Sequence, residues 1–216
     1  MLMLTKYLQS PAGCMAIAYG NIHLRGDINT LSKRILRECG TDSSYALRIK
    51  APLIYSLIRR HKPKLMVETG VQNGISTYFI LKAMYENNFG KLISIDLPFS
   101  KGSIREYDGH KDTSWIPKGK LPGWVVPESL KSRWRLILGD SKDILPKLHL
   151  NGLDFFMHDS EHSYKVQKFE YEWAYSNILK GVIASDDIEW GSAWDDFLTK
   201  YNLPIIVYPY AYTIKE

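Results

Sequence analysis

Five short apolar segments recur along the chain, and each ends at or just before a glycine or an aspartate: 65–67, 92–96, 134–138, 153–157 and 182–185. Apolar residues at helical spacing occupy other stretches, at 31–60, 75–87, 142–148, 164–179 and 192–201. Short buried strands that alternate with helices form a parallel sheet covered on both faces. The sequence therefore predicts a doubly wound α/β fold with a mainly parallel sheet, and one or two edge strands at 204–214.

One long stretch departs from this alternation. Residues 97–130 contain several prolines, glycines, lysines and aromatic residues without a regular period. A connection of this length is often a lid or a binding loop, and this one leaves the carboxyl end of a strand, where open α/β sheets bind ligands. We therefore expect a lid-like insertion, in which Tyr107, Trp115 and Trp124 either stack on a substrate or anchor the loop. The expected domains are a helical or irregular extension at 1–51 and one folded domain at 52–216.

The composition limits the classes of protein that remain. A chain of 216 residues with 45% apolar and 24% charged residues is typical of one globular domain, and no apolar run is long enough for a membrane span. Two cysteines do not form a disulfide framework, which favours a cytoplasmic setting. The net charge of +5 is not concentrated enough to indicate a nucleic-acid partner. The sequence leaves open whether subunits pair into a homo-oligomer.

The first apolar segment leads into a turn with two glycines, spelled ETGVQNGIS over residues 68–76. Gly70 permits a sharp turn after a strand, and Gly74 permits the backbone to approach a ligand or a neighbouring helix closely. The spacing lacks the third glycine of the dinucleotide fingerprint, and no Lys-Ser/Thr pair follows Gly74 as in a P-loop. A plain strand–helix turn remains the alternative.

Two further strand ends carry side chains that suit a nucleoside. Asp96 ends the second expected strand, where a carboxylate can accept both hydroxyl protons of a ribose. Asp140 and Ser141 follow the third strand. Asp140 fits either an adenine contact or the N-cap of the next helix.

Ionisable side chains cluster after the fourth and fifth strands. Four of them lie within residues 158–162, and Asp186 and Asp187 follow the fifth strand. Burying so many charges is costly unless they are paired or bound to a metal. The carboxylates of Asp159, Asp186 and Asp187 at neighbouring strand ends would form an oxygen-rich site that suits Mg²⁺. Singly, each aspartate also fits an N-cap or a loop hydrogen bond.

Taken together, these motifs resemble the class I methyltransferases that use S-adenosylmethionine (SAM). The resemblance is closest to the family of the sugar O-methyltransferases, the macrolide-sugar O-methyltransferases and the cephalosporin hydroxylase-like proteins, and catechol O-methyltransferase is a more distant relative. It covers roughly residues 52–190, and the pieces that carry it are 67–76, 139–141, 158–164 and 185–187. Gln72 departs from the pattern, because many methyltransferases have a glycine there.

The resemblance implies a role for each matched position. The residues implied in SAM binding are Glu68, Thr69, Gly70, Gly74, Ser76, Asp96, Asp140 and Ser141. Asp159, Asp186 and Asp187 would hold a divalent cation, expected to be Mg²⁺, and His162 would act with Asp159 in catalysis as the general base.

The function expected is methyl transfer from SAM to a hydroxyl of a sugar or another small molecule. A cation would lower the pKa of the acceptor, and His162, with an ordinary pKa of about 6.5, would take its proton. No Asn-Pro-Pro-Tyr motif indicates amine methylation. The alternative from another class is a SAM- or nucleotide-binding domain without methyl transfer, in a hydroxylase-like or binding role.

Overall fold

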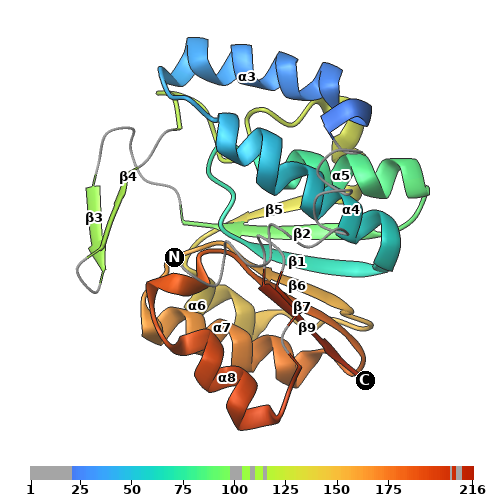
Figure 1. Ribbon diagram of the computed structural model, residues 1–216, viewed down its shortest axis with the longest axis vertical. Helices are drawn as coiled ribbons and strands as arrows, with labels where there is room; N and C mark the ends of the chain where they lie inside the picture. The colour runs from blue at the N-terminus through green and yellow to red at the C-terminus, as the bar shows by residue number, and fades with distance from the viewer. Residues whose placement is uncertain (1–20, 98–103, 108–109, 114–115, 205, 208–210) are drawn as a thin grey trace.

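The computed structural model describes residues 21–97, 104–107, 110–113, 116–204, 206–207 and 211–216 (Figure 1). Its main element is a seven-stranded sheet with the order β5-β2-β1-β6-β7-β9-β8. The strands are β1 (Leu65–Thr69), β2 (Lys91–Asp96), β5 (Trp134–Leu138), β6 (Phe155–His158), β7 (Gly181–Ser185), β8 (Ile206–Val207) and β9 (Ala211–Lys215). The first five pair in parallel, and β9 runs antiparallel to both of its neighbours. The predicted doubly wound, mainly parallel α/β fold is confirmed.

Helices cover both faces of this sheet (Figure 1). On one face lie α3 (Arg25–Cys39), the π-helical turn η1 (Ala46–Lys50), α4 (Ala51–His61) and α5 (Ile75–Asn87). On the other face lie α6 (Ser141–Ile144), α7 (Tyr164–Asn177) and α8 (Ala193–Tyr201). Short 3₁₀ turns occupy Glu128–Arg133, Leu145–Lys147 and Ile188–Trp190. The helical stretch expected at 31–60 is divided, because α3 ends at Gly40 in the left-handed conformation.

Consecutive residues of the central strands pack into two different hydrophobic clusters. In β1, Met66 belongs to the cluster under α3, α4 and α5, whereas Val67 belongs to the cluster under α7 and α8. In β6, Phe155 and Phe156 divide in the same way. This follows from the alternation of side chains along a strand, and it explains why these strands are apolar without a break.

The segment expected to be an extension contributes to the main core. Apolar residues of α3, among them Ile28, Leu31 and Ile35, are buried in the same cluster as α4 and α5. The boundary expected between residues 51 and 52 falls where η1 continues directly into α4. Among the helices that the structure describes, none is long and apolar enough to cross a membrane.

The insertion after β2 has two parts with different surroundings. An antiparallel pair, β3 (Ile104–Tyr107) and β4 (His110–Thr113), projects away from the sheet (Figure 1). The part from residue 116 packs against the glycine turn, and Trp124 donates to Asn73 with 2.7 Å between Nε1 and Oδ1. Trp124 therefore anchors the loop. Trp115 and the side chain of Tyr107 lie outside the described part of the chain.

Candidate functional site

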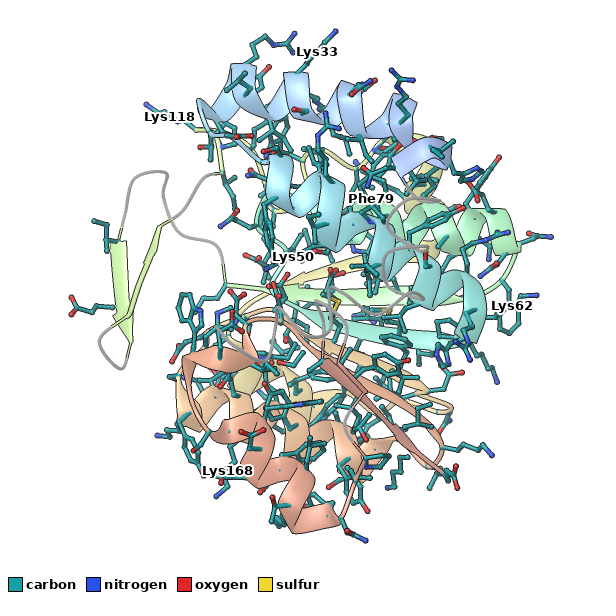
Figure 2. All side chains as sticks on the ribbon, viewed as in Figure 1. Lys33, Lys50, Lys62, Phe79, Lys118 and Lys168 are labelled. Atoms are coloured by element: carbon teal, nitrogen blue, oxygen red, sulfur yellow. The ribbon has the colours of Figure 1, made fainter. Side chains whose placement is uncertain are left out.

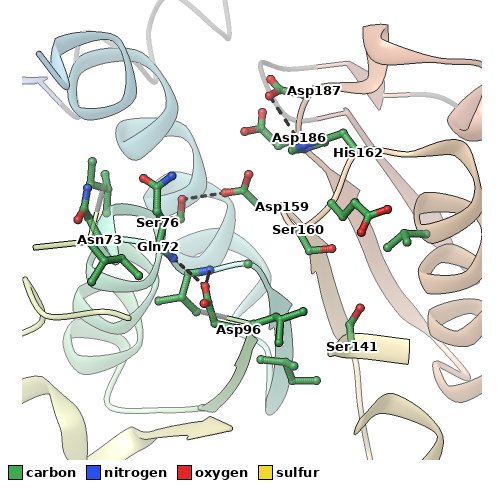
Figure 3. Close-up of a pocket in the computed structure, with 18 of the residues that line it drawn as sticks. Gln72, Asn73, Ser76, Asp96, Ser141, Asp159, Ser160, His162, Asp186 and Asp187 are labelled. Atoms are coloured by element: carbon green, nitrogen blue, oxygen red, sulfur yellow. Dashed lines mark hydrogen bonds and ion pairs between the residues drawn. The ribbon is translucent and has the colours of Figure 1, made fainter. Parts of the chain in front are cut away.

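Side chains at the carboxyl ends of the strands line one cavity of about 320 Å³ (Figure 3). This volume lies at the lower end of the range for small-molecule sites. The predicted residues that line it are Gly70, Ser76, Asp96, Asp140, Ser141, Asp159, His162, Asp186 and Asp187. They come together because the carboxyl ends of parallel strands share one edge of the sheet.

The glycine turn after β1 forms one wall of the cavity. Gly70 has a φ of 81°, and a Cβ added there would lie 1.8 Å from the carbonyl oxygen of Asp159. No side chain fits at that position, so glycine lets the turn after β1 touch the loop after β6. The Asp96 carboxylate fixes the turn, because its Oδ2 accepts from the backbone N–H groups of Val71 at 2.7 Å and Gln72 at 2.9 Å (Figure 3).

Asp140 and Ser141 follow β5 and line the same cavity as the glycine turn. Asp140 caps α6 by accepting from the backbone N–H of Lys142 at 2.9 Å. The N-cap alternative for Asp140 is therefore confirmed, although its side chain also lines the cavity. Ser141 is buried and hydrogen-bonds to Glu170 of α7.

Three residues predicted to bind the cofactor lie behind the cavity wall instead of lining it. Glu68 is fully buried, and its Oε2 accepts from the hydroxyls of Thr77 at 2.8 Å and Ser94 at 2.7 Å. Burial raises the pKa of Glu68 to about 7. Thr69 points to Glu170, and the missing side chain of Gly74 makes room for a neighbouring loop.

Gly74 brings the insertion against the turn after β1. Its φ is 90°, and a Cβ added there would lie 2.5 Å from the Cα of Gly123. The backbone N–H of Gly123 donates to the carbonyl of Gln72 at 2.9 Å. The sequence suggests close approach to a ligand or to a neighbouring helix, and the structure shows instead a close approach to the loop backbone at Gly123.

A buried carboxylate on α7 organises the floor of the site. Glu170 is fully buried and accepts from Thr69 Oγ1 at 2.5 Å and Ser160 Oγ at 2.8 Å, and its Oε2 lies 2.7 Å from Nδ1 of His158. Burial alone would raise the pKa of Glu170, but His158 and the surrounding hydroxyls hold it below its ordinary value. Glu170 thereby fixes Ser160, which lines the cavity.

The opposite end of the cavity is acidic. Asp159 follows β6, and its Oδ2 lies 3.5 Å from the hydroxyl of Ser76 across the opening (Figure 3). Asp186 and Asp187 follow β7, and Asp187 has a φ of 45°. Successive side chains of a strand point to opposite faces, and this left-handed residue breaks that alternation. Both neighbouring carboxylates can therefore contact one cation.

In this structure the cation beside Asp186 and Asp187 is the ammonium group of Lys50. Lys50, the last residue of η1, contacts Oδ2 of Asp186 through its Nζ and lies 3.3 Å from Oδ1 of Asp187. The Lys50 side chain is 18% exposed and the Asp186 side chain 4%. Removing two charges from water is costly, and mutual contact offsets that cost. Lys50 thus holds the helical layer of α3 to α5 against the end of β7.

One ammonium does not neutralise the whole acidic end. Burial raises the pKa of Asp159 well above its ordinary value, and the neighbouring Asp186 raises it further. The pKa of Asp186 is also raised by burial, while Lys50 opposes that change. Three carboxyl groups thus share one ammonium, and burial is the main reason that Asp159 and Asp186 resist ionisation.

His162 lines the acidic end, with its Nε2 4.0 Å from Oδ2 of Asp187. Burial and the neighbouring His158 lower the pKa of His162 to about 3. The sequence-based expectation that this imidazole titrates near neutrality is therefore wrong, because the ring is desolvated beside a second histidine. His162 is neutral at physiological pH, and its buried Nε2 has no hydrogen-bond partner in the described part of the chain.

The contacts of Lys50 bear on the predicted divalent cation. Within the residues that the structure describes, no group of three or more His, Cys, Asp or Glu side chains is arranged to hold a metal ion. Lys50 contacts two of the three carboxylates that were predicted as ligands. The arrangement fits a lysine ammonium among Asp159, Asp186 and Asp187 better than it fits a metal ion bound by all three.

Sequence reasoning missed Lys50 and Glu170. Lys50 is 136 positions from Asp186 and lies in a helical segment with other basic residues, so no local pattern distinguishes it. Glu170 lies six residues after a helix start, where a charged residue ordinarily faces solvent. The apolar neighbours of Glu170 in the helix were the available signal for its burial.

The family comparison identifies the part of the chain that carries these strand ends. A family model described as a methyltransferase domain matches residues 67–188. A comparison with curated proteins found no matching sequence.

Solved structures share the fold. The O-methyltransferase NovP superposes with a TM-score of 0.63 at 15% identity, over 91% of this chain and 99% of NovP. An O-methyltransferase from Bacillus cereus in complex with SAH gives a TM-score of 0.54 at 11% identity, over 88% of this chain and 90% of that one. A structure of CmcI with Mg and SAM gives 0.54 at 16% identity, over 78% and 72% of the two chains. At these identities the likeness concerns the fold.

Proposed function

Because the chain belongs to the methyltransferase-domain family, we propose that it transfers the methyl group of SAM to a hydroxyl of a sugar or another small molecule. The observation that carries this proposal is that one cavity has two unlike ends. One end has a glycine turn with the Asp96 carboxylate, and the other has three carboxylates with a histidine. A nucleoside fits the first end and a polar acceptor the second.

The cofactor lies along the glycine turn in this proposal. Asp96 holds the ribose hydroxyls with the carboxylate that also fixes the turn, and Asp140 and Ser141 face the adenine. Gly70 and Ser76 line the path from the ribose toward Asp159. The methionine end, and with it the sulfonium, is thereby directed to the acidic end. The SAH complex of the Bacillus cereus enzyme and the SAM complex of CmcI support this cofactor.

The reaction is a displacement at the methyl carbon. The acceptor oxygen forms a bond to the methyl carbon, the bond from that carbon to sulfur breaks, and its electron pair stays on sulfur. The hydroxyl proton passes to the neutral Nε2 of His162, which lines the cavity and has no hydrogen-bond partner among the described residues. Because the pKa of His162 is only about 3, the proton moves as the bond to carbon forms and the oxygen becomes positively charged, and not before. The leaving group is already good, so positioning of the acceptor supplies most of the catalysis.

The charge of the site favours a neutral acceptor. Lys50 is the only lysine or arginine among the described residues that line the cavity, and two carboxylates already engage it. A phosphorylated or carboxylated acceptor would meet the excess negative charge of Asp159, Asp186 and Asp187. We therefore infer an uncharged hydroxyl compound, with deoxysugars as the first group to screen.

Calorimetric titration with SAM, first with Mg²⁺ present and then with EDTA, tests the cofactor site. We expect micromolar binding under both conditions. A folded sample that binds SAM under neither condition would contradict the proposed function.

Variants separate chemistry from binding. Asp159→Ala and His162→Ala are expected to abolish methyl transfer and to retain SAM binding. If both lose SAM binding, the division of the cavity into two ends is wrong. Tight SAM binding without turnover on any hydroxyl compound would favour the alternative, a SAM-binding domain without methyl transfer.

A further inference from the structure

Lys50 reaches the acidic end of the cavity from the opposite layer of the molecule. It lies where the π-turn η1 meets α4, and its side chain extends to the carboxyl ends of the strands (Figure 2). Its Nζ contacts Asp186 and Asp187, which belong to the turn after β7. A residue far away in sequence therefore completes the acidic end.

The chemistry of an ammonium suits this place. It is a compact point charge with N–H donors, and near neutral pH it is the ordinary form of lysine. Between two carboxylates it supplies positive charge where a divalent cation would otherwise be needed. The tetrahedral donors can also orient an oxygen of a bound molecule, as a cation does.

A second observation points to a ligand beside this ammonium. Asp186 is 3% exposed, and its Oδ2 contacts Lys50. Its buried Oδ1 has no hydrogen-bond partner in the described part of the chain while Asp159 is ionised, although a protonated Asp159 donates to Asp186. A buried acceptor atom without a partner is rare and costs free energy. Asp186 lines the cavity, so a hydroxyl donor bound there would satisfy Oδ1.

We propose that Lys50 supplies the fixed positive charge at the acceptor end of the cavity, in the place where the sequence predicts a divalent cation. A second hydroxyl of the acceptor, next to the reacting one, donates to Oδ1 of Asp186, and the Lys50 ammonium beside it polarises the reacting oxygen. This assignment rests on the proposed function and makes the reaction independent of added metal. Lys50 and a divalent cation then compete for the same carboxylates.

Binding of Mn²⁺, followed by electron paramagnetic resonance on the full chain, tests this competition without an acceptor. The lysine variants are Lys50→Met, which removes the charge, and Lys50→Arg, which keeps it. Lys33→Met is the matched control, because Lys33 is an exposed lysine on α3 away from the cavity (Figure 2). We expect wild type, Lys50→Arg and Lys33→Met to bind Mn²⁺ only at millimolar concentrations. Lys50→Met should bind it at least about tenfold more tightly, since Asp186 and Asp187 lose the cation that they contact.

Two results would overturn the assignment. One is micromolar Mn²⁺ binding by the wild type, and the other is Mn²⁺ binding by Lys50→Met that is no tighter than that of Lys33→Met. If Lys50→Met does not fold alone, recovery of its thermal transition by Mn²⁺ supports competition, and failure of Mn²⁺ to restore it contradicts competition. SAM titration of the same samples is a separate readout. A wild type that binds no SAM contradicts the proposed function, whereas the Mn²⁺ result concerns Lys50.

Discussion

Glu170 of α7 and His158 of β6 are both fully buried and in contact, with 2.7 Å between Oε2 and Nδ1. The same carboxylate accepts from Thr69 at the end of β1 and from Ser160 in the cavity wall. One side chain therefore joins two neighbouring strands, the loop after β6 and the helix that covers them. Glu170 does not line the cavity, but it fixes Ser160, which does.

Removal of this carboxylate should destabilise the protein strongly. We expect Glu170→Ala to lower the free energy of unfolding by about 3 kcal/mol or more, because it leaves His158 and the hydroxyls of Thr69, Ser141 and Ser160 without their partner. Urea denaturation measures the change. Glu172→Ala on the same helix is the control, since Glu172 pairs with Lys200 at the surface, and its effect should be much smaller. Equal effects of the two substitutions would contradict the role of Glu170.

The buried carboxyl of Glu68 should make stability depend on pH. Its pKa is about 7 in the folded chain and 4.5 when unperturbed, with burial as the main cause. Between these values the folded state holds more protons than the unfolded state. The free energy of unfolding should therefore fall as the pH rises from about 4.5 to 7, by about 3 kcal/mol for this group.

Glu68→Gln isolates that contribution, because the amide keeps the shape and does not ionise. We expect the difference in free energy of unfolding between wild type and Glu68→Gln to change across this pH window. Urea denaturation at several pH values gives the difference. A difference that stays constant from pH 4 to pH 8 would show that Glu68 does not titrate there.

Gly74→Ala should disturb the contact between the insertion and the glycine turn. A Cβ at Gly74 would lie 2.5 Å from Gly123, and the φ of 90° is itself unfavourable for alanine. We expect a loss of about 1–3 kcal/mol in the free energy of unfolding and weaker SAM binding. Gly26→Ala is the control, because Gly26 has open space around its Cα in α3, and alanine suits a helix. Thermal denaturation and calorimetry compare the two, and a Gly74→Ala protein as stable as Gly26→Ala would refute the close contact.

Asp96→Ala should weaken SAM binding at least about tenfold, since two N–H groups of the turn and the ribose lose one shared acceptor. Asp96→Asn should lose less affinity, because its amide oxygen can still accept from the turn. Asp143→Ala, at an exposed position of α6, serves as the control in the same calorimetric titration. Unchanged SAM affinity in Asp96→Ala would show that Asp96 does not bind the ribose.

Much of the fold could be predicted because the central strands are buried on both faces and therefore read as apolar runs. Their carboxyl ends share one edge in any parallel sheet, so Gly70, Asp96, Asp159 and Asp186 could be brought together from sequence alone. Glu68 was predicted beside the cofactor and lies behind the wall, where the hydroxyls of Thr77 and Ser94 hold its buried carboxyl group.

Other parts of the site depend on packing between distant segments. The approach of Lys50 to Asp186 is set by how α4 lies on the sheet, and no spacing in the sequence encodes it. The low pKa of His162 depends on its desolvation beside His158, which is a property of the folded neighbourhood. The sequence shows that Trp124 is an aromatic residue of the insertion. It does not show that Trp124 donates to Asn73, because that contact depends on how the folded glycine turn places the Asn73 side chain.

The π-turn before α4 places Lys50, and its geometry has an evolutionary consequence. A π-turn amounts to one extra residue within an α-helix, and such turns occur often at functional sites. Lys50 runs without a break into α4, and one residue rotates an α-helix by about 100°. Loss of one residue before Lys50 would therefore turn the preceding segment while leaving the lysine in register with α4. The built-in cation is thus insulated from insertions and deletions upstream of the turn, whereas a single codon change at Lys50 itself removes it.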